Sequence, residues 1–167
     1  ADPENEAANR GLATVAVQAG DYDEAETYYR RALEHAPQVA GTWVNLAKLQ
    51  ILRGDQAAAM TTLKQGIEEN PQALEPRLYL GREYLRAGDT ASVLTVLAPM
   101  QPVYPDNEPL LGLLAQAQMD AGQYSEANIT LKRTFPIGLF SFSHCSSCMT
   151  YCICALSSES AIRLMKL

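Results

Sequence analysis

The sequence contains few of the residues and motifs that carry enzymatic chemistry. Only two histidines occur, His35 and His144, and the sequence has no HExxH motif, GxSxG motif or glycine-rich phosphate loop. His35 lies at the end of a predicted helix, where the helix dipole favours a positive charge. We therefore expect a protein that is not an enzyme and that uses no cofactor.

Long apolar runs and an excess of positive charge are also missing. Because no stretch of about 20 apolar residues occurs, the sequence predicts no membrane span. The chain has 13 basic and 19 acidic residues and a net charge of −6, which argues against general nucleic-acid binding, since that needs a basic face. The sequence shows neither an initiator methionine nor a signal peptide, so we expect a processed chain or a fragment of a longer array.

Glycine and proline, in contrast, recur at a fixed spacing of 34 residues. A constant period of this length predicts repeated helix–turn–helix units that stack on one another. Glycine in this phase is expected to end a first helix, and proline to stop a second one. The residues are Gly20, Gly54, Gly88 and Gly122, and Pro37, Pro71 and Pro105.

Apolar and small residues keep the same phase within units 6–39, 40–73, 74–107 and an incomplete 108–133. Counted from the start of each unit, position 7 is always leucine, position 8 is always small, and position 20 is alanine or valine. Positions 8 and 20 are expected to meet where the two helices of a unit cross. They are Ala13 and Ala25, Ala47 and Ala59, Gly81 and Val93, and Ala115 and Ala127.

This pattern resembles the tetratricopeptide repeat family, whose consensus begins W-x2-L-G-x2-Y. The second unit carries Trp43, Leu46 and Ala47, and the third carries Leu80, Gly81 and Tyr84 at the matching positions. The resemblance covers about residues 6–133. It implies an all-α, right-handed superhelical solenoid of about four helix–turn–helix units, and a scaffold or adaptor that binds other proteins.

Helix boundaries follow from the same phase. We expect first helices near 6–19, 40–53, 74–87 and 108–121, and second helices near 22–35, 56–69, 90–100 and 124–134. Asp21, Asp55 and Asp89 stand where they can cap the second helices. Pro99 and Pro102 should end the second helix of the third unit early or kink it.

The family resemblance implies that the first helices line a concave groove that binds a peptide or helix. The basic side chains among the candidates favour a partner with acidic and apolar residues. The alternative is that they are ordinary solvated polar residues. The candidates are Arg10, Thr14, Val17, Asn45, Lys48, Leu52, Tyr79, Arg82, Arg86, Gln116 and Met119.

Two narrower resemblances within the family bear on function. Members that clamp the C-terminal carboxylate of chaperones match at Arg10 and Asn45, but Glu75 would repel that carboxylate, which disfavours this role. The stretch from Tyr104 to Tyr124 is similar to bacterial repeat arrays of exopolysaccharide export and exosortase systems. That similarity implies a bacterial protein in a secretion assembly, either periplasmic or envelope-associated; a cytoplasmic location is the alternative.

Residues 134–167 have a different composition and break the repeat phase. The segment contains all four cysteines and all three phenylalanines of the chain. Three interpretations stay open: an abnormal, non-native terminus; a weakly structured or capping end; and a metal site of soft ligands, since thiolates bind zinc, copper or iron–sulfur clusters. The ligands of such a site would be His144, Cys145, Cys148, Cys152 and Cys154.

Two alternatives to a groove-binding adaptor therefore remain. One is a metal-binding or redox role of the cysteine-rich segment. The other is a purely architectural piece of a longer array. In that case the exposed array ends, rather than the groove, would be adhesive, and the chain would self-associate.

Overall fold

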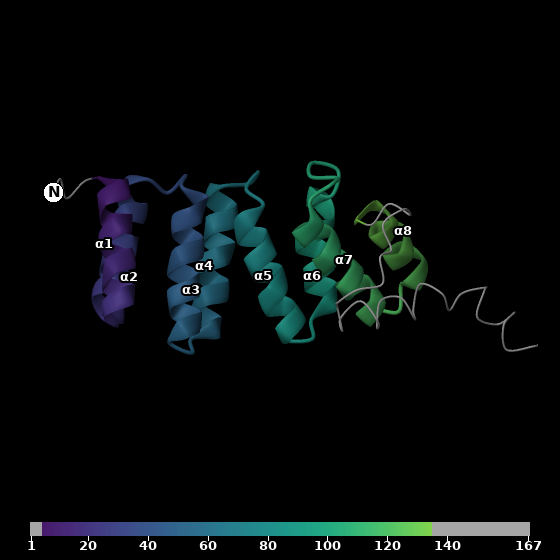
Figure 1. The fold of residues 1–167 in the computed structure, drawn as a ribbon, viewed down its shortest axis with the longest axis horizontal. Coiled ribbons are helices and arrows are strands. Elements are labelled where there is room, and N and C mark those ends of the chain that lie inside the picture. The colour runs from purple at the N-terminus through teal and green to yellow at the C-terminus, as the bar shows by residue number, and fades with distance from the viewer. Residues whose placement is uncertain (1–4, 135–167) are drawn as a thin grey trace, which may run out of the picture.

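The computed structural model describes residues 5–134, and within them the chain is helical. Successive helices pair through short turns, and the pairs stand side by side along the long axis of the molecule (Figure 1). The elements are α1 (Glu6–Ala19), α2 (Tyr22–His35), α3 (Ala40–Leu52), α4 (Gln56–Glu69), α5 (Glu75–Arg86), α6 (Thr90–Leu97), the 3-10 helix η1 (Ala98–Met100), α7 (Glu108–Asp120) and α8 (Tyr124–Thr134).

The packing order is that of a solenoid. Each first helix packs on the second helix of its own unit, and each second helix then packs on the first helix of the next unit. In addition, α3 packs on α5, and α5 on α7. Since these contacts join each helix pair to its neighbours, the fold is close to one-dimensional. The predicted all-α solenoid is confirmed.

The turns inside the units have the predicted backbone. All four turn glycines have φ between 74° and 86°, the left-handed region that side chains other than glycine rarely adopt. The carboxylates of Asp55 and Asp89 accept hydrogen bonds from the backbone N–H groups of Ala58 and Ser92, at 2.9 and 3.0 Å. Asp21 makes no such bond, so the expected cap is absent from α2.

The second helix of the third unit is shorter than those of the other units, as its prolines predicted. Its second helix ends at Leu97 and continues only as η1, which contains Pro99. The shortening follows because proline has no N–H to donate and its ring clashes with the preceding turn. An irregular segment then runs to Asn107, which caps α7 by accepting a hydrogen bond from the N–H of Leu110 at 3.0 Å.

The core follows the small positions of the repeat. Ala13 and Ala25, which face each other in the first unit, are both fully buried, as is Ala59 in the second. Close approach also depends on Gly66, where an added Cβ would lie 2.7 Å from the Cβ of Trp43. Small side chains thus set the distance between the paired helices.

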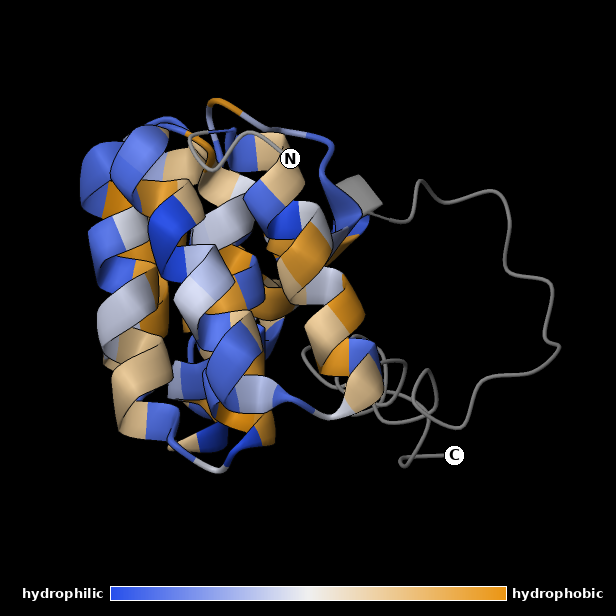
Figure 2. Cartoon of the chain, turned by 90° about the vertical axis from the view of Figure 1, so that its left-hand side faces the viewer, coloured by the Kyte–Doolittle hydropathy of each residue, from blue (hydrophilic) through white to orange (hydrophobic). Residues whose placement is uncertain are grey.

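The four repeat leucines do not share one environment. Leu46, Leu80 and Leu114 are at most 4% exposed, whereas Leu12 is 41% exposed. The three buried leucines belong to units that pack against a preceding unit. Among residues 5–134, no unit precedes α1. Figure 2, which views this end of the array, shows hydrophobic residues along α1 beside the label N.

Candidate partner-binding face

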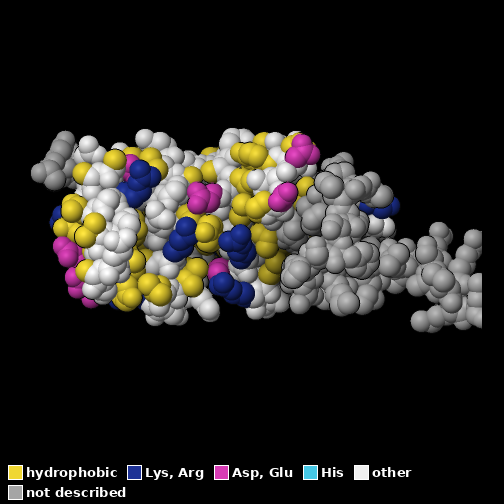
Figure 3. Space-filling model, in the orientation of Figure 1, with side chains coloured by type: hydrophobic (Ala, Val, Ile, Leu, Met, Phe, Trp, Pro, Cys, Tyr) yellow, Lys and Arg dark blue, Asp and Glu magenta, His cyan; other side chains and the backbone are white. Residues whose placement is uncertain are grey.

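The predicted groove residues of the two central units lie in two matching rows on first helices. Asn45, Lys48 and Leu52 are spaced by three and four residues on α3, which places them on one face of that helix. Tyr79, Arg82 and Arg86 have the same spacing on α5. Lys and Arg side chains gather over the middle of this face in Figure 3. We call the six residues the basic face.

Tyr79 lies at the centre of the basic face, between two cations. The Nζ atom of Lys48 is 4.7 Å from the centroid of the Tyr79 ring, and the Cζ atom of Arg82 is 5.2 Å from it. Contacts of this length attract a cation to the negative face of an aromatic ring. The ring therefore holds together two like charges that come from different units.

Lys48 and Arg82 differ from the other two basic candidates, Arg10 and Arg86, in their ion-pair partners. Arg10 pairs with Glu6 at 3.4 Å, and Arg86 pairs at 2.6 Å with Glu83, which is only 5% exposed. Among residues 5–134, no carboxylate lies within 4.0 Å of the charged group of Lys48 or Arg82. The positive charge of these residues that has no carboxylate partner is therefore concentrated around Tyr79.

The remaining candidates contribute less charge. The hydroxyl of Thr14 donates to the Arg10 carbonyl at 2.9 Å, and the Gln116 amide donates to the Asp120 carboxylate at 2.8 Å. Leu52 is 58% exposed and adds an apolar surface one turn from Lys48. The other three candidates are half-buried: Val17, Asn45 and Met119.

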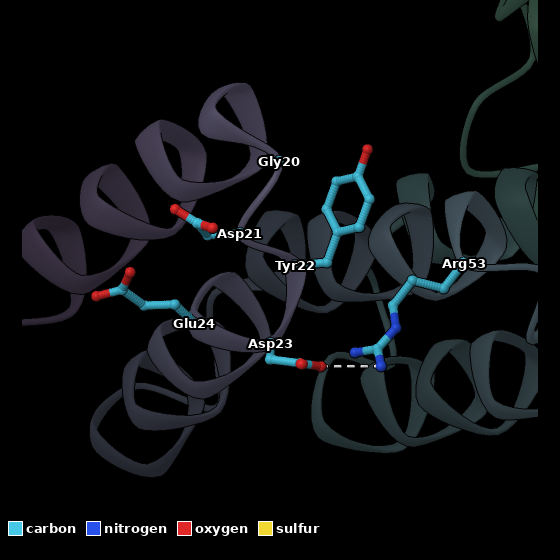
Figure 4. A pocket seen from close by; sticks show the side chains of 6 residues that line it. All are labelled: Gly20, Asp21, Tyr22, Asp23, Glu24 and Arg53. Atoms are coloured by element: carbon cyan, nitrogen blue, oxygen red, sulfur yellow. Dashed lines mark ion pairs between the residues drawn. The ribbon is translucent and has the colours of Figure 1, made fainter.

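An acidic pocket at the turn between α1 and α2 has a structural role. The pocket, about 410 Å³ in volume, is lined by Asp21, Asp23 and Glu24 together with Arg53 from the end of α3 (Figure 4). Arg53 pairs with Asp23 at 2.9 Å and with Glu26 at 2.7 Å. It therefore links the first two units and neutralises part of the acidic cluster.

The structure adds two features that the sequence analysis missed. Glu83 occupies repeat position 10, which is apolar in the other units, and it serves as the buried partner of Arg86. Gln50 and Thr62 form a buried hydrogen bond of 2.8 Å, and Gln118 and Thr130 form the same pair at 2.9 Å. The sequence offered a signal for both features, because each of these polar residues occupies a repeat position that is Ala, Val, Leu or Tyr in other units.

The described part of the chain contains neither a cluster of metal ligands nor a membrane-spanning helix. Residues 5–134 contain no group of three or more His, Cys, Asp or Glu side chains that could hold a metal ion. The candidate ligands His144, Cys145, Cys148, Cys152 and Cys154 lie outside the described residues. None of the helices in the described range is long and apolar enough to span a bilayer.

The fold and the repeat pattern define the class of the protein as an α-helical solenoid. The family model of the tetratricopeptide repeat matches residues 16–79. Residues 16–79 thus carry tetratricopeptide repeats, and proteins with this fold serve in general as scaffolds for protein–protein interaction. A comparison with curated proteins gives no match.

Several solved structures share this fold. The crystal structure of the MamA protein matches with a TM-score of 0.64 at 17% identity, over 80% of this chain and 73% of that one. TTC0263, a thermophilic tetratricopeptide repeat protein of Thermus thermophilus, matches with a TM-score of 0.58 at 24% identity, over 77% and 72%. The Cut9–Hcn1 hetero-tetramer of APC/C matches with a TM-score of 0.63 at 16% identity, over 80% of this chain and 25% of that one. At these identities the likeness shows the fold alone.

Proposed function

We propose that the chain is a non-catalytic adaptor that binds an acidic segment of a partner protein on the basic face. The observation that carries the proposal is the Tyr79 ring flanked by Lys48 and Arg82, neither of which has a carboxylate partner among the described residues. Two cations held close together repel each other, and a bound carboxylate relieves that repulsion. The ring positions both cations before the partner arrives.

The neighbouring side chains indicate what else the partner carries. Leu52 lies one helical turn from Lys48, about 6 Å along the axis of α3, and is largely exposed. A partner that places an apolar side chain beside a carboxylate would contact both residues. We therefore expect a peptide or helix in which Asp or Glu stands near Leu or Phe.

Charge reversal on the basic face tests this proposal. In the variant Lys48→Glu/Arg82→Glu, peptides that combine Asp or Glu with Leu or Phe should bind at least about tenfold more weakly by fluorescence anisotropy. Binding by the unaltered protein should also weaken as salt rises, because exposed charges are screened.

The control carries the same change of charge on second helices. Arg31→Glu/Lys64→Glu alters two exposed cations of α2 and α4 and should leave peptide binding unchanged. Equal affinity in both double variants, or no binding by the unaltered chain, would show that the basic face is not the site. A pull-down with the same three proteins would then identify any partner held elsewhere.

A second candidate function, self-association through α1, has its own support. Repeat position 10 is buried in the later units, where it is Leu49, Glu83 and Ala117, but Val15 at this position is 62% exposed. The face of α1 with Leu12 and Val15 therefore corresponds to a surface that packs against another unit elsewhere in the array. We propose that it packs against α1 of a second copy, as two-fold interfaces use one patch twice.

The remaining expectations from the sequence are untested. The link to exopolysaccharide export, the bacterial origin and the division into an array of residues 1–133 and a tail of residues 134–167 stay predictions. The alternative metal-binding or redox role falls on the cysteine-rich segment, outside the described residues.

A further inference from the structure

A cleft of about 370 Å³ lies between the first two units, on the side of α3 away from the basic face. Trp43, Leu46 and Gln50 face it, spaced by three and four residues along α3. The row of basic-face residues on α3 is offset from this row by two residues, or roughly 200° around the helix. The cleft and the basic face can therefore be occupied independently.

The cleft has apolar walls and a polar floor. Leu33 of α2 and Leu46 of α3 contribute apolar surface, and the half-buried Trp43 ring is held by its indole N–H, which donates to the Pro37 carbonyl at 2.7 Å. At the floor, the Thr62 hydroxyl donates to the Gln50 carboxamide at 2.8 Å, and both residues are 6% exposed. This combination suits a side chain with an apolar body and a polar tip.

The junction between the second and third units shows which side chain fits the volume that corresponds to the cleft. The residues 34 positions after Gln50 and Thr62 are Tyr84 and Val96. Both are packed into the core cluster of that junction together with Ile67, the counterpart of Leu33. The chain itself thus fills the equivalent volume with a tyrosine, whereas the first junction has smaller polar side chains there and stays open.

The charges at the rim of the cleft indicate which residue should flank the bound side chain in the partner. Glu34 and Glu69 line the cleft and are exposed, and no cation among residues 5–134 lies within 4.0 Å of either carboxylate. Arg30, also at the rim, is paired with Glu26 at 2.7 Å. In the next junction the ammonium of Lys64, the counterpart of Arg30, lies 5.9 Å from the Tyr84 ring centroid, so Arg30 stands where it can contact the ring of a bound tyrosine. Glu34 and Glu69 then favour a cation on the residue next to that tyrosine.

We infer that this cleft is a second binding site, which takes a tyrosine side chain flanked by lysine or arginine from a partner protein. The phenol ring lies against Leu33, Leu46 and Trp43, and its hydroxyl reaches the Gln50 carboxamide. The adjacent cation pairs with Glu34 or Glu69. The site differs in face and in sign of charge from the basic face, so the adaptor can hold two partners of opposite charge at once.

The only tryptophan of the chain gives a direct readout, because it lines the cleft. Titration of the full chain with acetyl-Tyr-Arg-amide should shift the Trp43 indole N–H resonance in a saturable way, with a dissociation constant on the order of 1 mM for so small a probe. Acetyl-Ala-Arg-amide and acetyl-Tyr-Glu-amide should each bind at least about threefold more weakly. Absence of a saturable shift, or equal shifts with all three probes, overturns the inference.

A second test of the site uses variants that carry the residues of the junction between the second and third units. Gln50→Tyr/Thr62→Val should fill the cleft from within and abolish the saturable shift, whereas Thr61→Val, the same change at an exposed site of α4, should leave it unaltered. Retained binding by the filled variant contradicts the site. If that variant does not fold, Glu34→Lys/Glu69→Lys decides: weaker binding of acetyl-Tyr-Arg-amide supports the site, and unchanged binding overturns it.

Discussion

At the scale of single residues, the distance between paired helices is set by small side chains. Gly66 in α4 faces Trp43 of α3, where an added Cβ would be 2.7 Å from one tryptophan carbon and 2.9 Å from the next. Both carbons are near the backbone of Trp43, so they cannot move aside as the end of a long side chain would. Alanine at this position therefore has to push the two helices apart.

We expect Gly66→Ala to destabilise the protein by roughly 1–3 kcal/mol, the usual effect of overpacking a core. Gly112→Ala is the matched control, because it also lies within a helix but has nothing within 4 Å of an added Cβ. That control should stabilise the fold by about 0.5–1 kcal/mol, since alanine favours a helix over glycine. Urea denaturation of both variants checks the pair, and a neutral Gly66→Ala would contradict the packing argument.

At the scale of helices, the second helices differ in how they begin. Asp89 at the start of α6 accepts hydrogen bonds from both the N–H and the hydroxyl of Ser92, at 3.0 and 2.6 Å. These bonds, first the one from the hydroxyl and then the one from the N–H, lower the pKa of Asp89 below its ordinary value of 3.8. Asp21 at the start of α2 makes no side-chain cap bond.

The lowered pKa predicts a pH dependence of stability. Because the folded pKa lies below the unfolded one, the ionised Asp89 stabilises the fold above the unfolded value, and this contribution is lost as pH falls through the folded pKa. Asparagine can cap without ionising, so Asp89→Asn should flatten the fall in melting temperature in the acid range. Asp21→Asn is the control and should change that slope less. Equal slopes in both variants would contradict the assigned role of Asp89.

At the scale of the whole molecule, the position of a unit in the array decides the environment of equivalent residues. Leu12 has the same role in the repeat as Leu46, Leu80 and Leu114, yet it alone of the four is largely exposed. Val15 repeats this difference one turn further along α1. The first unit therefore presents an apolar surface that the later units bury.

The proposed self-association predicts a change of oligomeric state. Leu12→Gln/Val15→Gln should convert a dimer of the full chain into a monomer in sedimentation velocity under reducing conditions, because the apolar area of the interface is removed. Val103→Gln, which changes a residue of similar exposure (54%) between α6 and α7, should leave the dimer intact. A monomeric unaltered chain, or a Leu12→Gln/Val15→Gln variant that still dimerises, rules out this interface.

Local sequence patterns were enough to predict the repeat and most of the local structure. The fixed phase of glycine and proline predicted the helices closely, and Pro99 predicted the early end of α6, because φ preferences and missing N–H donors act within a few residues. The small residues at positions 8 and 20 likewise predicted which helix faces meet, since helical spacing alone places them.

Contacts between the packed units determine which of the predicted site residues have no ion-pair partner and where a cleft stays open. Arg86 and Arg82 look alike in the sequence, but Arg86 is paired with a buried glutamate while Arg82 stacks on Tyr79. Gln50 and Tyr84 occupy the same repeat position, yet the first borders an open cleft and the second fills the space. Such differences arise from contacts between units, whose side-chain packing depends on residues far apart in the chain and so leaves no local pattern.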